Sequence, residues 1–254
     1  MNDAAVFGTV LTPAQILQLA GDGNASKATL GQFAFGGGWY SAIYFANTGT
    51  SSVSFPISFT GDKGLPLNIP SISGSSTTIT LAPGASTKIE APNVGSLEEG
   101  YVSMVLPIGV TGYGVFRQSV PGATDQEAVV PLSYAGASNQ TLVYDETNST
   151  TTAVAIVNPS SVVATVTITV EDVNGNVIGT SSPPIMLQPF NKTEAVLRML
   201  PGLSGMEGNQ GIANFSVSSG DVVVLGLRAK GLALTSIPAV NQKQLSDFTG
   251  EPFF

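Results

Sequence analysis

Apolar and polar residues alternate along most of this chain, and one alternating stretch occurs twice in the same phase. Segments 42–59 and 153–170 align without a gap, and Asn158 follows Asn47 by 158 − 47 = 111 positions. The apolar positions that share one face in each copy are Val53, Phe55, Ile57 and Phe59, then Ala164, Val166, Ile168 and Val170. Such alternation is typical of half-buried β-strands. We therefore predict an all-β protein built by internal duplication.

Further strands are predicted around these two stretches, separated by turns rich in Gly, Asn and Pro. They cover 30–35, 77–81, 87–91, 100–106, 111–117 and 128–131 in copy one, and 141–144, 212–217 and 237–240 in copy two. Arg228 follows Arg117 by 228 − 117 = 111 positions, which suggests that the offset holds to the end of each copy. About seven strands per copy, with turns at short intervals, indicate two tandem immunoglobulin-like β-sandwich domains.

The duplication sets the expected boundaries. Residues 1–29 form an N-terminal extension with a strand at 4–11 and a short helix at 14–20; copy one spans 30–135, copy two 136–242 and a tail 243–254. The linker between the copies is short, and we expect the domains to be hinged or lightly packed. The predicted core residues are Phe55, Phe59, Phe116, Val166, Ile168 and Leu227.

Composition narrows the possible partners and the setting. The formal net charge of −8 argues against nucleic acid or an anionic membrane as a partner, because both attract basic surfaces. No segment reaches the ~20 apolar residues of a membrane span, so we expect no membrane insertion. Few Lys residues among many Ser and Thr favour an extracellular or cell-surface location, although residues 1–7 do not resemble a signal peptide.

Catalytic residue types are scarce. Without His or Cys, the chain cannot form Ser-His-Asp or Cys-His nucleophile systems, or His- and Cys-ligated metal sites. Asp125 and Glu127 could act as a carboxylate pair in a hydrolase, but copy two has no acidic pair in its shorter loop. The adjacent acidic pairs are Glu98-Glu99, Asp145-Glu146 and Glu171-Asp172. Neighbours on a strand point to opposite faces, so we predict no metal site, no cofactor and no enzyme activity.

Two pairs of residues have competing interpretations. Trp39 and Tyr40 follow three glycines and could form an aromatic platform for a sugar, with Tyr44 or Tyr113 as further candidates, or could pack in the core. Arg117 and Arg228 each end an apolar strand, and we predict that they have a structural role at the rim of the sandwich.

Three segments of the chain resemble those of a known group of sequences. They are Gly112-Tyr-Gly-Val-Phe-Arg-Gln-Ser-Val-Pro-Gly-Ala-Thr-Asp-Gln-Glu-Ala-Val-Val-Pro-Leu-Ser133, the Gly-Gly-Gly-Trp-Tyr run at 36–40 and Leu200-Pro-Gly-Leu-Ser-Gly205. Across residues 30–240 the chain resembles an uncharacterised tandem β-sandwich region near the ends of large secreted proteins of environmental bacteria. The resemblance implies a secreted or surface-attached bacterial module, and it implies no catalytic residue.

These observations favour a non-catalytic structural or adhesive module of a bacterial surface or extracellular assembly. A carbohydrate-binding module is the alternative, with polysaccharide as the partner, and a carboxylate hydrolase ranks last. Both ends of the chain carry apolar residues that could pack across a subunit boundary and build a homopolymer. These residues are Val6, Phe7, Val10, Leu11, Leu245, Phe248, Phe253 and Phe254.

Overall fold

The computed structural model of the chain describes residues 26–134 and 136–241. Over these ranges the regular elements are antiparallel β-strands and short 3-10 helices at Pro70–Ile72, Leu197–Met199 and Ser204–Met206. The all-β prediction is therefore confirmed. The strand predicted at 4–11, the helix at 14–20 and the tail 243–254 lie outside the described residues, as do all eight apolar positions proposed for assembly.

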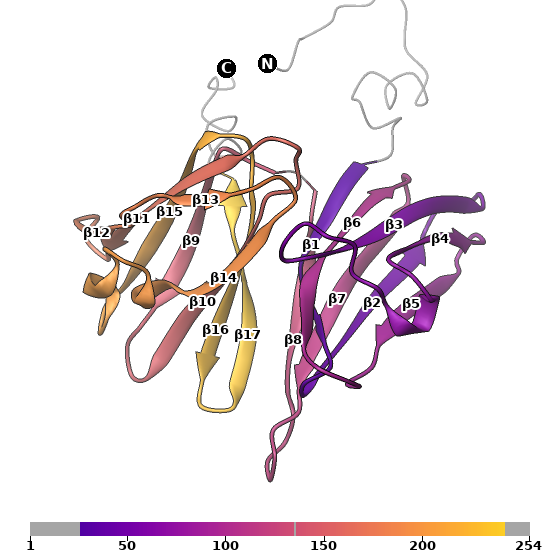
Figure 1. Cartoon of the computed structure of the whole chain (residues 1–254), viewed down its shortest axis with the longest axis horizontal. Helices are drawn as coiled ribbons and strands as arrows, with labels where there is room; N and C mark the ends of the chain where they lie inside the picture. The colour runs from indigo at the N-terminus through magenta and orange to yellow at the C-terminus, as the bar shows by residue number, and fades with distance from the viewer. Residues whose placement is uncertain (1–25, 135, 242–254) are drawn as a thin grey trace, which may run out of the picture.

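The first half of the chain forms one eight-stranded sheet that curves back on itself (Figure 1). Its strands are β1 (Ser26–Phe35), β2 (Trp39–Asn47), β3 (Val53–Gly61), β4 (Ser76–Leu81), β5 (Ser86–Ala91), β6 (Glu98–Leu106), β7 (Val110–Gln118) and β8 (Gln126–Ser133). The order is β4-β3-β6-β1-β8-β7-β2-β5, and β1 pairs with both β6 and β8. A register shift between Leu30 and Phe33 interrupts β1, and such bulges bend a strand.

The second half forms two sheets. Its strands are β9 (Asn139–Asp145), β10 (Thr150–Val157), β11 (Ala164–Asp172), β12 (Val177–Thr180), β13 (Ile185–Leu187), β14 (Lys192–Val196), β15 (Gln210–Ser219), β16 (Val223–Lys230), β17 (Ala233–Pro238) and β18 (Val240–Asn241). One sheet has the order β14-β10-β16-β17 and the other β12-β11-β15-β9-β18, with β13 paired to β11. The partners of β9, β10, β11 and β15 thus follow the same order as those of β1, β2, β3 and β6.

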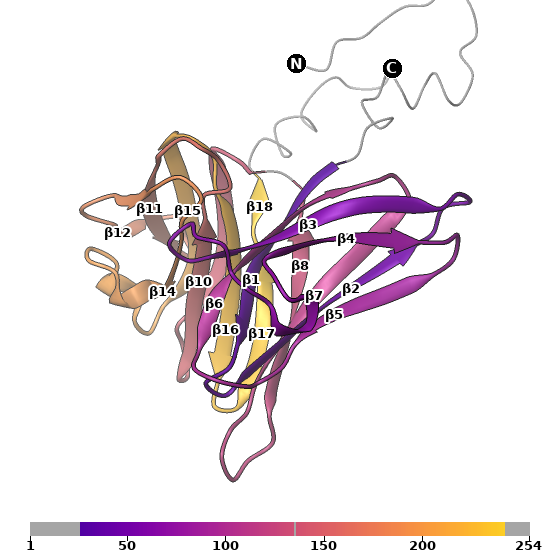
Figure 2. The same cartoon turned by 45° about the vertical axis from the view of Figure 1, so that its right-hand side comes forward.

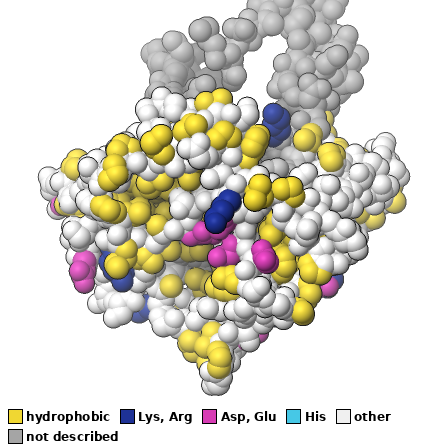
Figure 3. Space-filling view, viewed as in Figure 1, with side chains coloured by type: hydrophobic (Ala, Val, Ile, Leu, Met, Phe, Trp, Pro, Cys, Tyr) yellow, Lys and Arg dark blue, Asp and Glu magenta, His cyan; other side chains and the backbone are white. Residues whose placement is uncertain are grey.

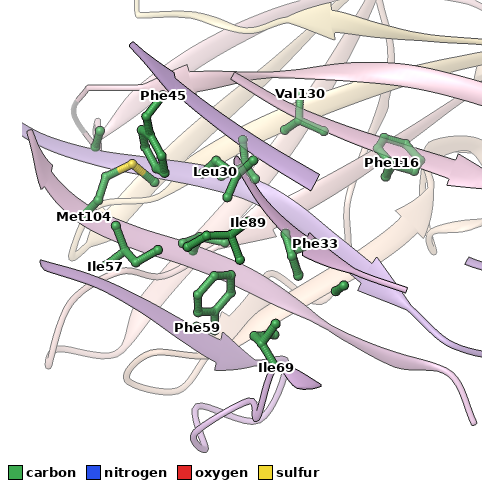
Figure 4. Packing of buried hydrophobic residues seen from close by; sticks show 14 of the residues in the cluster. Leu30, Phe33, Phe45, Ile57, Phe59, Ile69, Ile89, Met104, Phe116 and Val130 are labelled. Atoms are coloured by element: carbon green, nitrogen blue, oxygen red, sulfur yellow. The ribbon is translucent and has the colours of Figure 1, made fainter. Parts of the chain in front are cut away.

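Each half encloses its own cluster of buried apolar side chains. In the first half, Phe45 and Val130 face Leu30, Met104 and the residues around Phe59 from the opposite side of the curved sheet (Figure 4). The second cluster is built from aliphatic residues around Phe215 and Tyr144. The predicted core residues Phe55, Phe59, Phe116, Val166 and Ile168 are all buried, which confirms them as core.

A buried asparagine ends β2, and another occupies the same place after β10. The Asn47 side-chain nitrogen lies 2.9, 3.2 and 3.1 Å from the carbonyl oxygens of Ser51, Leu81 and Ala82. The Asn158 nitrogen lies 2.7, 3.1 and 3.1 Å from those of Val162, Leu187 and Gln188. Each Oδ1 accepts an amide N–H two residues later. Because buried carbonyl groups need donors, each Asn holds the strand connection around it together.

The two halves are closely packed against each other. Ala155 of β10 and Leu225 of β16 belong to the cluster of the first half, and β17 lies along β8 (Figure 2). A Cβ atom added to Gly31 of β1 would approach the Leu225 Cβ to 3.2 Å, so the backbones approach closely there. The expectation of hinged or lightly packed halves is therefore wrong, because β10 and β16 present apolar residues on both faces.

The offset of 111 residues does not hold in β16. Thr152 pairs with Arg228, whereas offset 111 would pair it with Leu227, because Ser41 pairs with Phe116 in the first half. A slip of one residue moves every side chain to the other face of a strand. Leu227 is therefore only partly buried and packs against the first half's cluster, so its placement in the core of the second half was wrong.

Candidate functional site

The aromatic pair predicted after the three glycines is divided between two faces of β2. Gly36, Gly37 and Gly38 have φ angles of +69°, +57° and +102°, which favour glycine at this turn. The Trp39 ring is partly buried and lies 5.5 Å from the core ring of Phe116. The structure thus places Trp39 in packing, the alternative that the sequence left open.

Tyr40 lies on the outer face of β2 within a polar group. Its hydroxyl donates to Glu90 Oε1 at 2.6 Å, and the guanidinium carbon of Arg117 lies 4.6 Å from its ring centroid. Burial and the hydrogen bond to Glu90 raise the pKa of the Tyr40 hydroxyl, so it remains a donor at neutral pH. Lys88 also binds Glu90, at 2.7 Å. Tyr40 is therefore fixed by its neighbours.

Tyr44 and Tyr113 form an exposed aromatic stack further along the same face. They are directly opposite in the pairing of β2 with β7, with ring centroids 5.1 Å apart and ring planes 17° apart. Tyr113 is 45% exposed. A groove of about 510 Å³ beside the stack is lined by Ser86, Thr87, Lys88 and Thr111. Of the four aromatic candidates named from the sequence, these two alone form a pair with one ring largely exposed, beside hydroxyl and amine groups.

The two arginines are both at the rim, but they are not equivalent. Arg117 stacks on Tyr40 and lies 3.4 Å from the Asp125 carboxylate, with both side chains about two-fifths exposed. Arg228 donates to Asp145 Oδ2 at 2.8 Å and lies 3.4 Å from the Thr150 hydroxyl. Both arginines thus make the local ion pairs expected of a rim residue. Their 111-residue spacing nevertheless joins positions on opposite faces of β7 and β16, as the register shows.

Most of the carboxylates singled out in the sequence are held in local contacts, and Glu99 belongs to the joint between the halves described below. Asp125 faces Arg117, and Glu127 pairs with Arg117 in the ladder of β7 and β8. Asp145 is bound by Arg228 and by the Thr147 hydroxyl, while the neighbouring Glu146 is buried and binds Arg198 and the Thr152 amide. Glu171 accepts from Asn214, and Asp172 accepts three bonds within its turn. Within each of the pairs Asp145-Glu146 and Glu171-Asp172, the two carboxylates thus bind different partners.

A joint between the halves brings together four charged residues that the sequence did not connect. Lys192 at the start of β14 has a fully buried side chain, and its ammonium lies 3.0 Å from Asp62 Oδ1 and pairs with Glu194. Glu99 lies in the same group, since single oxygens of Asp62, Glu99 and Glu194 fall within 4.8 Å of one another. Acidic side chains gather at the middle of the face where the two halves meet (Figure 3). We call these four residues the lysine joint.

The surroundings of the lysine joint are apolar and well ordered by hydrogen bonds. Tyr101, Val157 and Val223 form a small buried cluster, and Lys192 pairs with Val157 in the ladder of β10 and β14. The Tyr101 hydroxyl donates to the Phe190 carbonyl at 3.1 Å, which ties β6 to the loop before Lys192. Burial lowers the pKa of the Lys192 amine, although Asp62 and Glu99 act in the opposite direction.

A lysine at the start of a short strand gives no local signal of burial, which is why the sequence did not identify the joint. In the strand ladders Lys192 pairs with Val157 as Ser86 pairs with Ala46, so the first half has a small polar residue at the matching place. A comparison of the two copies could have found the joint. Three residues after Pro189 the second copy has a lysine, where the first copy has a serine.

Comparison with known proteins gives no relative from which a role could be carried over. No family model matches the chain, and no curated protein matches it. Over the described residues, no helix combines the length and apolar character needed to cross a membrane.

Proposed function

We propose that the chain is a pair of tandem immunoglobulin-like domains that arose by duplication. The repeated strand pairing and the paired Asn47 and Asn158 support this origin. Two close backbone approaches also recur. A Cβ on Gly100 would meet the Thr60 carbonyl, and one on Gly211 would meet the Glu171 carbonyl, each 111 residues later. Gly114 lies against Leu30 as Gly226 lies against Leu142, and these pairs are 112 residues apart.

The function that we propose is a non-catalytic structural or adhesive module of a bacterial cell surface or extracellular assembly. The lysine joint is the observation that carries this proposal, because it ties the two halves together beside a shared apolar cluster and would hold them as one unit. A rigid pair of domains suits a spacer or subunit better than an enzyme that must open and close. The carboxylates held in ion pairs and the absence of His and Cys from the sequence also support a non-catalytic role.

Self-association would make the module a repeating unit. We place that contact in the apolar residues of segments 4–11 and 244–254, which could pack on a neighbouring copy. Sedimentation velocity and negative-stain microscopy of the full chain should show concentration-dependent oligomers or filaments. A chain limited to residues 26–241 should remain monomeric. A full-length protein that stays monomeric at high concentration would contradict the polymer and leave the two-domain module unaffected.

Carbohydrate binding is a second candidate, favoured by the Tyr44–Tyr113 stack. Tyrosine faces bind the apolar faces of pyranose rings, and the hydroxyl and amine groups in the adjacent groove could bind sugar hydroxyls. Affinity electrophoresis in gels that contain neutral polysaccharides should show retardation of the protein. Tyr113→Ala should abolish it, while Tyr134→Ala, at another exposed tyrosine, should not. If the wild-type protein, Tyr113→Ala and Tyr134→Ala migrated equally in every gel, carbohydrate binding at the Tyr44–Tyr113 stack would be rejected.

A further inference from the structure

The lysine joint holds an amine and a carboxyl oxygen within hydrogen-bonding distance of each other. Lys192 Nζ lies 3.0 Å from Asp62 Oδ1, in a side chain with no exposed surface. The carbon that would be attacked, Cγ, is bonded to that oxygen, and groups held side by side gain effective concentrations far above those of free groups in solution. This contact joins β14 of the second half to the turn after β3 of the first half.

The backbone on both sides of this contact is fixed. The Lys192 amide donates to the Asp62 carbonyl at 2.9 Å, and Lys63 forms an isolated bridge with Asn191. The Asp62 amide is itself bound to the Glu99 carbonyl at 3.3 Å. Folding therefore holds the backbone of Lys192 directly beside that of Asp62.

The surroundings favour the neutral form of the amine, which is the nucleophilic form. Val157, which forms a buried cluster with Tyr101 and Val223, is paired with Lys192 in the strand ladder, and burial lowers the pKa of Lys192. The buried ammonium keeps its desolvation cost in the ion pair, which a neutral product would remove, whereas the Asp62 side chain is about a third exposed. Three carboxylates surround the single amine, so two remain to carry protons while one reacts.

We propose that Lys192 and Asp62 join through an intramolecular amide bond that covalently links the two halves of the chain. The Nζ–Cγ bond forms and one Cγ–O bond of the Asp62 carboxyl group breaks. Glu194 accepts a proton from the attacking amine and passes it to the departing oxygen, which leaves as water. The neutral amine and the protonated carboxyl group thus give one amide and one water. No oxidant, reductant or other reactant is required.

The test is the mass of the full-length protein after denaturation. The chain is expected to be lighter than its sequence by the mass of one water, once its N-terminus has been established by peptide mapping. Trypsin should fail to cut after Lys192, and a branched peptide should join the segment with Asp62 to the segment with Lys192. Full sequence mass together with cleavage after Lys192 would overturn the proposal, and so would a bond from Lys192 to Glu194 or Glu99.

Variants separate this bond from other losses of water. Lys192→Arg keeps the positive charge and Asp62→Ala removes the acceptor, and both are expected to restore the full mass. Lys88→Arg is the matched control, because Lys88 and Glu90 repeat the two-residue spacing of Lys192 and Glu194 on an exposed strand. It should keep the mass loss. Glu194→Gln should leave a fraction of the protein at full mass, since it removes the proton carrier. Because the wild-type measurement needs no variant, a variant that fails to fold leaves the test intact.

Discussion

The two halves of the chain use the same asparagine hydrogen bonds to connect their strands, but they have different ion pairs at their rims. Asn47 and Asn158 make the same set of bonds in the same kind of corner. At the rims, however, Arg117 forms an exposed pair with Asp125, whereas Arg228 and Arg198 bind Asp145 and the buried Glu146. The asparagines that donate hydrogen bonds to backbone carbonyl groups therefore match between the halves. The ion pairs at the rims do not match.

Two Lys-Glu pairs, one in each half, differ even more in their exposure to water. Lys88 and Glu90 on β5 are each about half exposed, while Lys192 on β14 has a fully buried side chain beside Glu194. Water screens an exposed pair, so it contributes little to stability. A buried amine instead depends on its carboxylates and on the packing around it. The same two-residue spacing thus produces a surface contact in one half and the joint between the halves in the other.

The largest expected effect compares Phe116 with Leu227, which the 111-residue spacing treats as equivalents. Phe116→Ala removes a fully buried ring and should lower the free energy of unfolding by about 3–5 kcal/mol. Leu227→Ala removes a partly buried contact between the halves and should cost about 1–2 kcal/mol. Urea unfolding curves measure both. Equal losses would show that the two positions are equivalent and that the assigned register of β16 is wrong.

A second prediction concerns the paired asparagines. Asn47→Ala and Asn158→Ala should each lower the free energy of unfolding by about 1–3 kcal/mol, because each leaves buried carbonyl oxygens without a donor. The losses should be similar in the two halves. Asn176→Ala is the control, since Asn176 donates only within an exposed turn, and it should have little effect. A large difference between Asn47 and Asn158 would argue against a common role.

Much of the strand pattern could be predicted from the sequence, because period-two alternation depends only on which residues face the core. Segment 164–170 is buried at every second residue, as predicted. The register of β16 could not be predicted, since its first five residues, 223–227, have no polar side chain and carry no alternation that marks its inner face. The close packing of the halves was missed for the same reason: Ala155 and Leu225 resemble core residues of their own half.

The candidate site was predicted only in part. Aromatic residues on β2 could be named, but the choice of Tyr44 and Tyr113 over Trp39 depends on which face of the sheet each residue occupies. The lysine joint depends on contacts between residues 130 positions apart, such as Lys192 with Asp62. No local pattern reports such a contact, because burial of the lysine arises from the docking of one half on the other.

The smallest expected effect is a difference in acid stability between the two rims. Hydrogen bonds from Thr147 and then Arg228 hold the pKa of Asp145 at about 2, below its ordinary value of 3.8. A carboxyl group with a lowered pKa in the folded state stabilises the protein above its unfolded pKa, and this stabilisation is lost as the pH falls through the folded pKa. The loss should therefore occur between about pH 4 and pH 2.

Thr147→Val and Arg228→Met should both raise the pKa of Asp145 and shift this loss of stability to higher pH. The effect of Thr147→Val should be the greater, because its hydrogen bond is the larger cause. Arg117→Met is the control at the other rim, where the pair with Asp125 is exposed on both sides, and it should leave the acid transition where it is. Urea unfolding at a series of acid pH values measures the transition. If Arg117→Met shifted the acid transition as far as Arg228→Met, the two rims would be electrostatically equivalent. The lysine joint alone would then distinguish the charged residues of the two halves.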